Sequence, residues 1–341
     1  MSDPGGGRKK GGRIWLLTPF VLLMLLTLGY GGYWMVAKSR LETEIDARAD
    51  AMRRAGYTVE MEGRRLDGFP FRLRLTLPNV RIASPAGWSL GAPSFEAQAY
   101  LHDPGHWVFL APQGLTINRP KGGGLTVKGE ALRASLVGLG GPNWRGAAEG
   151  VKLAFAPATG AAPFSLAAAE RMDLNIKPGD ADQVMMLIRL QGGKAGAGAL
   201  LQRMAADAPV TGLLDLKATK AAAFQGASFG EAAKAWSTAG GQVEIVRTEL
   251  QGGTVAAWAK GGVLTAGRDG RLQGSIPLEM RQAAKSLGAL AGQPLDPNTA
   301  RTAASIAAAR DQGGSATLNL VFQAGVTTLG PVPIGPAPKV F

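Results

Sequence analysis

The sequence predicts a β-rich fold, all-β or α+β. In it, an N-terminal transmembrane helix and a helical stalk precede antiparallel, curved meander sheets with a few alanine-rich helices. Three observations predict this fold: an uncharged apolar run at residues 14–36, an alternation of apolar and polar residues from residue 57 onward, and turn-forming residues between the alternating stretches. The 341 residues are 46% hydrophobic and 18% charged, which supplies enough apolar surface for a sizeable core.

The predicted transmembrane helix occupies residues 14–36. At about 1.5 Å per residue the run reaches about 34 Å, enough to cross a hydrocarbon core of about 30 Å. Trp15 lies at one end and Tyr30, Tyr33 and Trp34 at the other, where amphipathic rings favour the headgroup layers. A cleaved signal peptide is the alternative, but its apolar stretch spans only about 7–15 residues and ends in small side chains, whereas this run ends in bulky ones. We therefore expect an uncleaved anchor that crosses the membrane once.

A basic tail, residues 1–13, precedes the span. It carries Arg8, Lys9, Lys10 and Arg13, which we expect to contact anionic lipid headgroups at about 1 kcal/mol each. Basic residues also follow the span, so the excess of positive charge does not by itself decide the orientation. Because a long domain can translocate regardless of its charge, we predict a cytoplasmic tail and a body on the other side of the membrane.

Residues 37–56 predict a helical stalk that continues the span. Leu41 and Ile45 begin an apolar stripe at helical spacing, and Glu44 and Arg48 form an i,i+4 pair of opposite charge. Gly56 suits the position just past a helix end. An ordinary surface helix that caps the body is the alternative interpretation.

The remaining residues, 57–341, predict one β-rich domain with a subdomain junction near residues 192–198, where the sequence GGKAGAG loses all periodicity. The clearest alternation places Phe69, Phe71, Leu73, Leu75 and Leu77 on one face. Further strands are predicted at residues 57–61, 94–101, 107–110, 125–128, 151–155, 172–177, 242–249, 255–264, 272–280 and 316–323. Asp269-Gly270 predicts a hairpin with a type I′ turn.

Helices are expected to interrupt the strands at a few alanine-rich stretches. They are predicted at residues 182–190, 198–206, 228–237, 280–290 and 297–311. Pro297 is acceptable in a first helical turn. Ser228, followed three residues later by Glu231, predicts an N-cap with a capping box.

The composition excludes much of enzyme chemistry. The chain has no cysteine and only two histidines, which removes disulfide scaffolds, cysteine-ligated metals and thiol nucleophiles. His102 and His106 with Asp103 fall short of the usual ligand count for zinc, and their Pro-Gly neighbours indicate an exposed turn. Ser228 sits in a G-x-S-x-G sequence, but no buried strand precedes it and both histidines lie before it in the chain, against the order of that hydrolase motif. We therefore predict no catalytic residue, no metal, no cofactor and no enzymatic activity.

The net charge of +12 raises the question of a nucleic-acid partner. Beyond the tail there is no run of Lys or Arg and no interleaving of basic and aromatic residues, so nucleic-acid binding is not expected. A membrane surface accounts for the basic tail more simply. The lipid bilayer is therefore the first expected partner.

Several stretches resemble the bacterial domain-of-unknown-function family 2125. They are GYTVEMEGRRLDGFPFRLRLTLPNVRI at 56–82, AWSTAGGQVEI at 235–245, GRDGRLQGSIPLEM at 267–280 and LGPVPIGPAP at 329–338. The resemblance spans nearly the whole chain after the anchor and implies a membrane-anchored protein of a Gram-negative envelope. It therefore implies single-pass attachment to the bacterial inner membrane with the C-terminal domain in the periplasm. It supplies no activity and no functional residues.

A more distant resemblance is to AsmA-like inner-membrane proteins, which combine an N-terminal anchor with repeated strands and Asp-Gly hairpins. That resemblance implies a long curved sheet around an apolar groove for lipid. The alternating face from Phe69 to Leu77 must pack against something, either a second sheet or a bound acyl chain, and the sequence leaves both open.

The functional hypothesis that follows is a protein that binds or shields a hydrophobic envelope component, in particular lipid, on Phe69, Phe71, Leu73, Leu75 and Leu77, without catalysis. The alternative is an envelope scaffold that docks another membrane or periplasmic protein through its sheet edges, its helices, Arg72, Arg74 or the proline-rich stretch 330–338.

Overall fold

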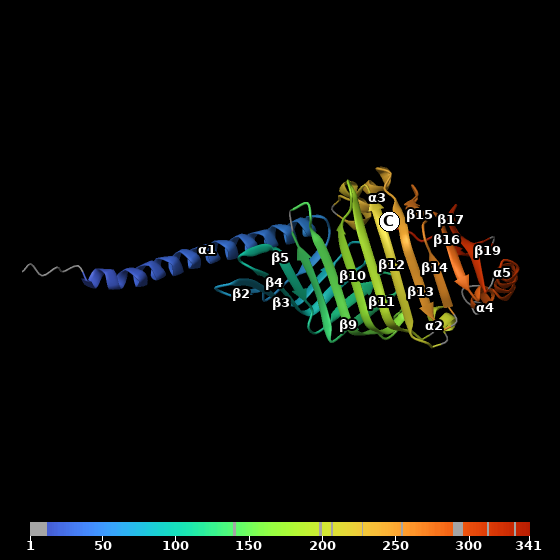
Figure 1. Cartoon of the computed structure of the whole chain (residues 1–341), viewed down its shortest axis with the longest axis horizontal. Helices are drawn as coiled ribbons and strands as arrows, with labels where there is room; N and C mark the ends of the chain where they lie inside the picture. Colours follow the sequence, from blue (N-terminus) through green and yellow to red (C-terminus); the bar gives the residue numbers. More distant parts are fainter. Residues whose placement is uncertain are drawn as a thin grey trace, which may run out of the picture.

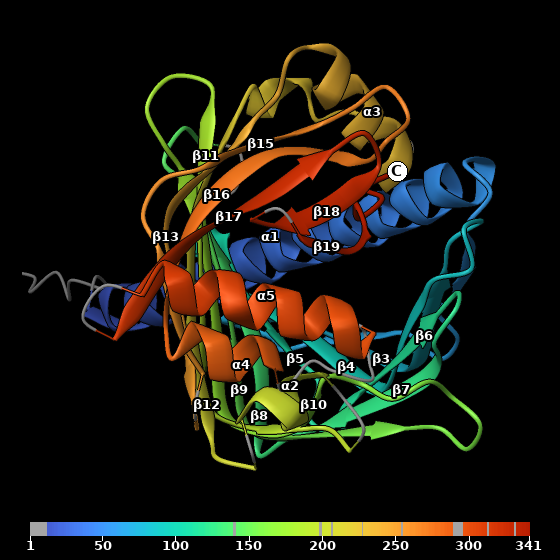
Figure 2. The same cartoon turned by 90° about the vertical axis from the view of Figure 1, so that its right-hand side faces the viewer.

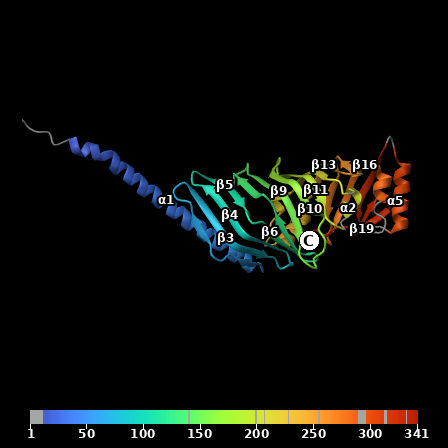
Figure 3. The same cartoon turned by 90° about the horizontal axis from the view of Figure 1, so that it is seen from below.

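A computed structural model of the chain shows a long N-terminal helix attached to a strongly curved sheet (Figure 1). The structure describes residues 12–138, 141–197, 200–205, 207–226, 228–253, 255–288, 296–311, 314–330 and 332–341. Helix α1 and the body lie roughly end to end, so the molecule is elongated (Figures 1 and 3).

Helix α1 (Gly12–Arg54) contains both the predicted span and the predicted stalk without a break. Its stretch from Pro19 to Arg54 is the one helix, within the described residues, that is long and apolar enough to cross a membrane. The helix ends before Gly56, whose φ of +86° suits a glycine. The prediction of an N-terminal apolar helix that continues as a stalk is therefore confirmed.

The body consists of one sheet with nineteen strands among the described residues, most of them antiparallel to their neighbours in the chain. The first nine are β1 (Thr58–Glu60), β2 (Arg65–Asp67), β3 (Arg72–Ala83), β4 (Ser89–Tyr100), β5 (Asp103–Leu110), β6 (Leu115–Arg119), β7 (Gly123–Lys128), β8 (Ala131–Val137) and β9 (Arg145–Pro157). The others are β10 (Leu166–Pro178), β11 (Gln183–Ala195), β12 (Val210–Thr219), β13 (Val243–Gly252), β14 (Val255–Ala259), β15 (Val263–Ala266), β16 (Leu272–Arg281), β17 (Ser315–Gln323), β18 (Val326–Leu329) and β19 (Val332–Pro336).

From β8 to β13, and again from β16 to β19, the sheet is a meander in which each strand pairs with the next. Between these parts, β14 and β15 each pair with both β13 and β16. Near its start, β4 pairs with both β5 and β6, and β9 pairs with both β7 and β8, so the sheet divides into two short branches there. Accumulated strand twist curves the whole sheet into a trough, seen along its length in Figure 2. The predicted β-rich fold of antiparallel, curved meander sheet is therefore confirmed.

The remaining helices are short. They are α2 (Leu200–Ala205), the 3₁₀ turn η1 (Ala221–Ala223), α3 (Phe229–Thr238), α4 (Ala283–Gly288) and α5 (Pro297–Ala309). Each α-helix falls within, or starts one residue from, a predicted helical stretch. The Ser228 hydroxyl accepts a hydrogen bond from the Glu231 N–H at 3.2 Å, which confirms the predicted N-cap of α3.

Two local predictions need correction. The helix predicted at 182–190 is wrong, because residues 183–190 lie in β11 with hydrogen-bonded strands on both sides, and such pairing overrides weak helical propensity. The hairpin at Asp269-Gly270 is confirmed, but its turn is not type I′, since of these two residues only Gly270 has a positive φ. At the predicted junction, residues 192–195 belong to β11, whose pairing with β12 shifts register between Leu190 and Gly193, and Gly198 lies outside the described residues; the subdomain junction stays a prediction.

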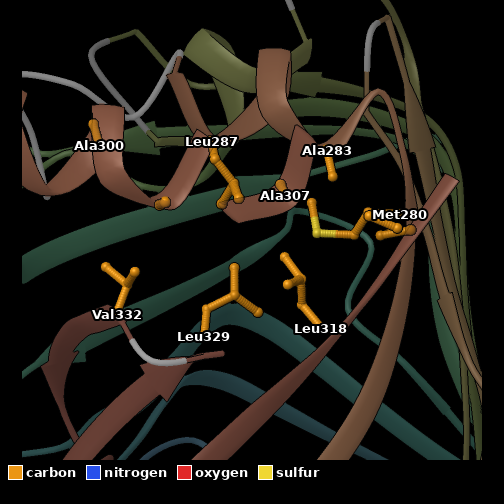
Figure 4. Close-up of a cluster of buried hydrophobic side chains, with 11 residues drawn as sticks. Met280, Ala283, Leu287, Ala300, Ala307, Leu318, Leu329 and Val332 are labelled. Atoms are coloured by element: carbon orange, nitrogen blue, oxygen red, sulfur yellow. The ribbon is translucent and has the colours of Figure 1, made fainter. Parts of the chain in front are cut away.

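The largest core cluster lies at the end of the body away from α1. Helices α4 and α5 pack there against β14, β16, β17, β18 and β19 (Figure 4). The cluster includes the buried side chains Met280, Leu287, Ala300, Ala303, Ala307, Leu318, Leu329 and Val332. This end of the trough is therefore filled by the protein's own side chains.

Candidate functional site

One face of the sheet carries an unbroken row of apolar side chains across eight strands. The register places Leu75, Ala97, Phe109, Ala134, Ala148, Leu174, Ile188 and Leu214 side by side on β3, β4, β5, β8, β9, β10, β11 and β12. Directly opposed residues share a face in an antiparallel sheet, so these eight side chains project to the same side. The row runs across the strands and therefore along the trough.

Two further apolar rows flank this one. One consists of Leu73, Ala99, Trp107, Leu136, Gly146, Ile176, Met186 and Leu216, and the other of Leu132, Gly150, Met172, Leu190 and Gly212. We refer to the three rows together as the apolar lane. No member of the lane carries a charge, so the lane can accept hydrocarbon but offers no group for acid–base or metal chemistry.

Helices cover both ends of the lane. At the near end, Leu41 and Ile45 of α1 pack against Leu75 and Leu77, and Trp34 packs against Leu73. At the far end, α4 and α5 cover the continuation of the same face on β14, β16 and β17. In Figure 2, α4 and α5 lie inside the outline of the sheet, and α1 runs behind them with both of its ends outside that outline.

Between these covers the lane is open. From β8 to β12 its large side chains are half-buried rather than buried: Leu132, Leu136, Met172, Leu174, Ile176, Met186, Ile188, Leu190, Leu214 and Leu216. Along its edges it is partly covered, since Leu132, Met172 and Leu190 pack against a buried cluster around Leu125 and Leu153, and Leu216 packs against one around Ile245. A cavity of about 480 Å³ opens over four of them, Leu132, Met172, Leu174 and Ile188. Its other walls include Phe109, Ala148 and Phe155, and Arg133, Glu149 and Asp173 also contribute. This volume lies within the range of about 300–1,000 Å³ that is typical of small-molecule sites. We refer to the part on β8–β12 as the open lane.

The opposite face of the same strands combines charged side chains with apolar ones such as Met185, Leu187 and Leu213. Glu149 on β9 pairs with Arg171 on β10 at 2.7 Å and also with Arg133 on β8, and Arg171 pairs with Asp173 at 2.9 Å. The hydrogen bond to Asp173, with the negative charges of Asp173 and Glu149, raises the pKa of Arg171 above its usual value. This ladder of charges identifies the outer face as the one that meets water.

A second cavity of about 480 Å³ lies mainly over that outer face. Arg145, Lys177 and Asp215 contribute to its walls beside Met185 and Leu187. Most walls of this cavity come from the outer face, whereas most walls of the first cavity are apolar side chains such as Phe109, Leu174 and Ile188, so the first cavity is the better match for an apolar ligand.

The structure separates the five residues predicted to line a ligand face. Leu73, Leu75 and Leu77 lie on β3 within or beside the lane and are buried, with α1 as their cover. Phe69 and Phe71 precede the strand, which begins at Arg72, and both are exposed. The expectation of one continuous strand face from 69 to 77 is therefore wrong for the two phenylalanines, because the Phe69-Pro70-Phe71 segment is a turn.

The other residues singled out in the sequence lie apart from the lane. Arg8, Lys9 and Lys10 lie outside the described residues, as does the side chain of Arg13. His106 approaches Asp103 at 3.6 Å and His102 lies beside the Tyr100 ring. Within the part of the chain that the structure describes, no three metal-ligating side chains come together.

The residues proposed for a scaffold surface are also accounted for. Arg72 is half-buried and donates to Gln98 at 3.3 Å, and the Arg74 Nε atom is buried without a hydrogen-bond partner among the described residues. Residues 332–336 form β19, and among the described strands β19 pairs only with β18, which leaves it at an edge of the sheet.

The open lane itself was not predicted. Its strands alternate visibly, as in Met172, Leu174 and Ile176, but the alternation on one strand does not show which residues of other strands join it. The register between strands supplies that information, and a single sequence does not contain it.

Comparison with known proteins gives one match. No curated protein and no solved structure matches the chain. The model of a protein family described as "Uncharacterized protein conserved in bacteria (DUF2125)" matches residues 34–338. That match begins at the last turn of the predicted span and includes every strand of the sheet, so the chain belongs to this family of uncharacterised bacterial proteins.

Proposed function

We propose that this protein is anchored in the bacterial inner membrane by α1 and uses its periplasmic sheet to bind or shield the acyl chain of a lipid in the open lane, without catalysis. The observation that carries the proposal is the half-buried, uncharged row of large apolar side chains beneath a cavity of about 480 Å³. Leaving such an apolar surface in contact with water costs about 25 cal/mol of free energy per Å², so a bound apolar ligand would stabilise it.

The dimensions support an acyl chain as the occupant. Five strands at about 4.8 Å spacing make the open lane about 19 Å long from β8 to β12. One leaflet of a bilayer holds its acyl chains in about 15 Å, half of a core of about 30 Å. A single chain of that kind fits along the lane, across the strands.

The helices that cover the two ends of the lane favour a protein that holds and shields a lipid over one that passes a lipid along the trough. Helix α1 occupies the lane at β3 and β4, and α4 with α5 fills its continuation at β16 and β17. A ligand would therefore enter and leave by the open side of the trough and would not pass out through the far end.

The test compares two neighbouring residues of β11 that face opposite sides. Ile188 lies in the open lane and Leu187 on the outer face, and both are half-buried. We expect Ile188→Asp to reduce binding of a fluorescent fatty-acid analogue to the detergent-purified protein about tenfold or more, because a carboxylate in an apolar site costs at least about 1–3 kcal/mol. Leu187→Asp should leave binding within about twofold, because its side chain lies on the other face of the sheet, away from the open lane.

Lipid extraction from the same preparations gives an independent readout. The wild-type protein and Leu187→Asp should carry lipid above a detergent control, and Ile188→Asp should not. If the wild-type protein and both variants all carried no more lipid than the detergent control, the proposal would be contradicted. A single stoichiometric protein crosslinked in cells, with no lipid adducts, would replace it with the scaffold function.

The absence of catalysis has its own test at Ser228. This side chain caps α3 instead of lying at a nucleophile turn, so a serine-reactive probe is expected to leave the protein unlabelled. Labelling that disappears in Ser228→Ala would establish a hydrolase.

A further inference from the structure

The turn between β2 and β3 lies against α1 at the level where the apolar span ends. It consists of Asp67, Gly68, Phe69, Pro70 and Phe71, and we refer to it as the aromatic turn. The Phe69 ring meets the Trp34 ring edge-on, with centroids 5.7 Å apart. The Phe69 Cε2 atom is also 4.0 Å from the position that a Cβ atom would take on Gly31. The turn therefore lies beside the last helical turn of the predicted span.

A hydrogen bond fixes this placement. The Trp34 indole N–H donates to the backbone carbonyl of Arg72 at 3.1 Å, directly after the aromatic turn. Trp34 is 8% exposed, although its neighbours Tyr33 and Met35 on the same helix are exposed. This hydrogen bond holds the start of β3 against α1 at the end of the predicted span. The distance between the aromatic turn and the span is therefore fixed by the fold.

The aromatic side chains of this region are nevertheless left uncovered. Phe69 is 53% exposed and Phe71 is 68% exposed. Tyr100, which pairs with Arg72 in the register of β3 and β4, is also exposed. Tyr30 and Tyr33 on α1 complete a group of aromatic rings at one level, and such rings favour the headgroup layer of a bilayer.

We infer that the aromatic turn enters the leaflet from which α1 emerges, so that the body contacts the membrane at a second point besides its helix. The occupant of this surface is the bilayer itself, because the surface is continuous with the part of α1 that spans it. Asp67, exposed at the end of β2, limits the depth to the boundary of headgroups and acyl chains. Arg72, on the next strand, supplies a positive charge at the level of anionic headgroups.

The consequence is a fixed orientation of the trough. A single helix would leave the body free to tilt, whereas two contacts constrain it. The near end of the lane, where Leu73 lies beneath Trp34, is then held against the leaflet. In Figures 1 and 3 this end of the sheet lies along α1, and the far end with α5 points away from it.

The natural chain has no cysteine, so single cysteines report on single positions. Full-length protein with Phe71→Cys is labelled with an environment-sensitive fluorophore and reconstituted in vesicles of phosphatidylethanolamine and phosphatidylglycerol. We expect the emission of the label to shift to the blue in these vesicles. We also expect its fluorescence to fall when the lipids carry a quencher near the headgroup. Tyr100→Cys provides a second reporter at the same level.

Trp88→Cys is the matched control. Trp88 is 52% exposed, close to Phe69, and lies in the turn at the other end of β3, about 36 Å away at about 3.3 Å per residue. Its label should be quenched by aqueous iodide and not by the lipid quencher. Phe71 and Tyr100 labels that behave like the Trp88 label would overturn the inference.

Leu25→Cys, in the middle of the apolar run, separates this result from the anchor itself. Quenching at Leu25 by a deep lipid quencher, without quenching at Phe71, would remove the second contact and leave the anchor and the lipid proposal intact. Loss of quenching at both positions would overturn the membrane span and the inference together. Quenching at Leu25 and Phe71, but not at Trp88, is the result that the structure predicts.

Discussion

The open lane on β8–β12 and the capped end at β14–β19 are two parts of one apolar face, yet they have different surroundings. In the capped end, Leu318 of β17 and Leu287 of α4 face each other across the core and are each 1% exposed (Figure 4). In the open lane, Leu174 and Ile188 belong to a continuous row of the same kind but stay half-buried under a cavity. Strand alternation alone does not distinguish these two outcomes, because both parts alternate apolar and polar residues.

The difference lies in what covers each part. The α4–α5 region follows β16 in the chain and folds back over the sheet, whereas β8 to β12 are joined by turns and short segments. Helix α2, between β11 and β12, packs at the end of these strands and not over their middle (Figure 2). An alternating sheet therefore becomes a core where the chain supplies a helix, and a candidate binding site where it does not.

The largest expected effect contrasts the two parts by truncation. Leu318→Ala should lower the free energy of unfolding by about 2–5 kcal/mol, since it leaves a cavity in a packed core. Ile188→Ala should lower it by only about 1 kcal/mol, because that side chain is already partly in water. Urea unfolding of both detergent-purified variants measures the difference. Equal losses would show that the open lane is packed as tightly as the capped end.

Enlargement gives the reverse contrast. Ala303→Leu in α5, where the alanine is 3% exposed, should cost about 1–3 kcal/mol by overpacking. Ala148→Leu in the open lane should change stability by less than about 0.5 kcal/mol, as is typical of sites with free space. The added side chain should instead fill part of the cavity and weaken binding of the fatty-acid analogue. A stable Ala148→Leu variant with unchanged binding would place the ligand elsewhere.

Local features of the fold were predictable because their causes lie within a few residues. The uncharged run before Lys38 defines the span, and Ser228 with Glu231 defines the start of α3. The helix predicted at 182–190 failed because its apolar residues, read alone, fit a buried helix as well as a strand. Pairing with β10 and β12 decides between them, and both partners are distant in the sequence.

The sequence predicted the chemical character of the candidate site but not the residues that form it. The sequence indicated an apolar face in need of a partner, and Leu73, Leu75 and Leu77 do belong to a buried face. Their cover is α1, a segment whose stripe at Leu41 and Ile45 was visible but whose docking position was not. The alternation also includes Phe69 and Phe71, which precede the strand, because periodicity does not mark where a turn ends and a strand begins.

The charge ladder behind the open lane offers a smaller effect. Glu149→Gln removes the ion pairs that Glu149 forms with Arg133 and Arg171. The free energy of unfolding should fall by roughly 0.5–1 kcal/mol at low salt. The loss should shrink as salt is added, because exposed arginines are screened. Glu130→Gln, which removes the exposed pair with Lys152, is the control and should change stability less. A salt-independent loss at Glu149 would assign it a packing role instead.

The smallest effect distinguishes the two parts by pH. The Asp296 carboxylate accepts hydrogen bonds from the Thr299 hydroxyl and from the N–H groups of Asn298 and Thr299 at the start of α5, and these bonds lower its pKa below the usual value. A carboxyl group with a lowered folded pKa stabilises the protein above its unfolded pKa of about 3.9, and this contribution is lost as the pH falls through the folded pKa.

Acidification below about pH 4 should therefore loosen the cover of the capped end, as seen in acid unfolding followed by hydrogen exchange in α5. Asp296→Asn keeps a good N-cap but has no carboxyl group to titrate, so its stability should vary less over this range. The open lane lies on other strands than Asp296 and its helix, so exchange in β10 and β11 over this pH range should be the same in the wild-type protein and in Asp296→Asn. A shared acid transition in α5 and β11, abolished by Asp296→Asn, would mean that the two parts unfold as one unit and that the cover stabilises the whole trough.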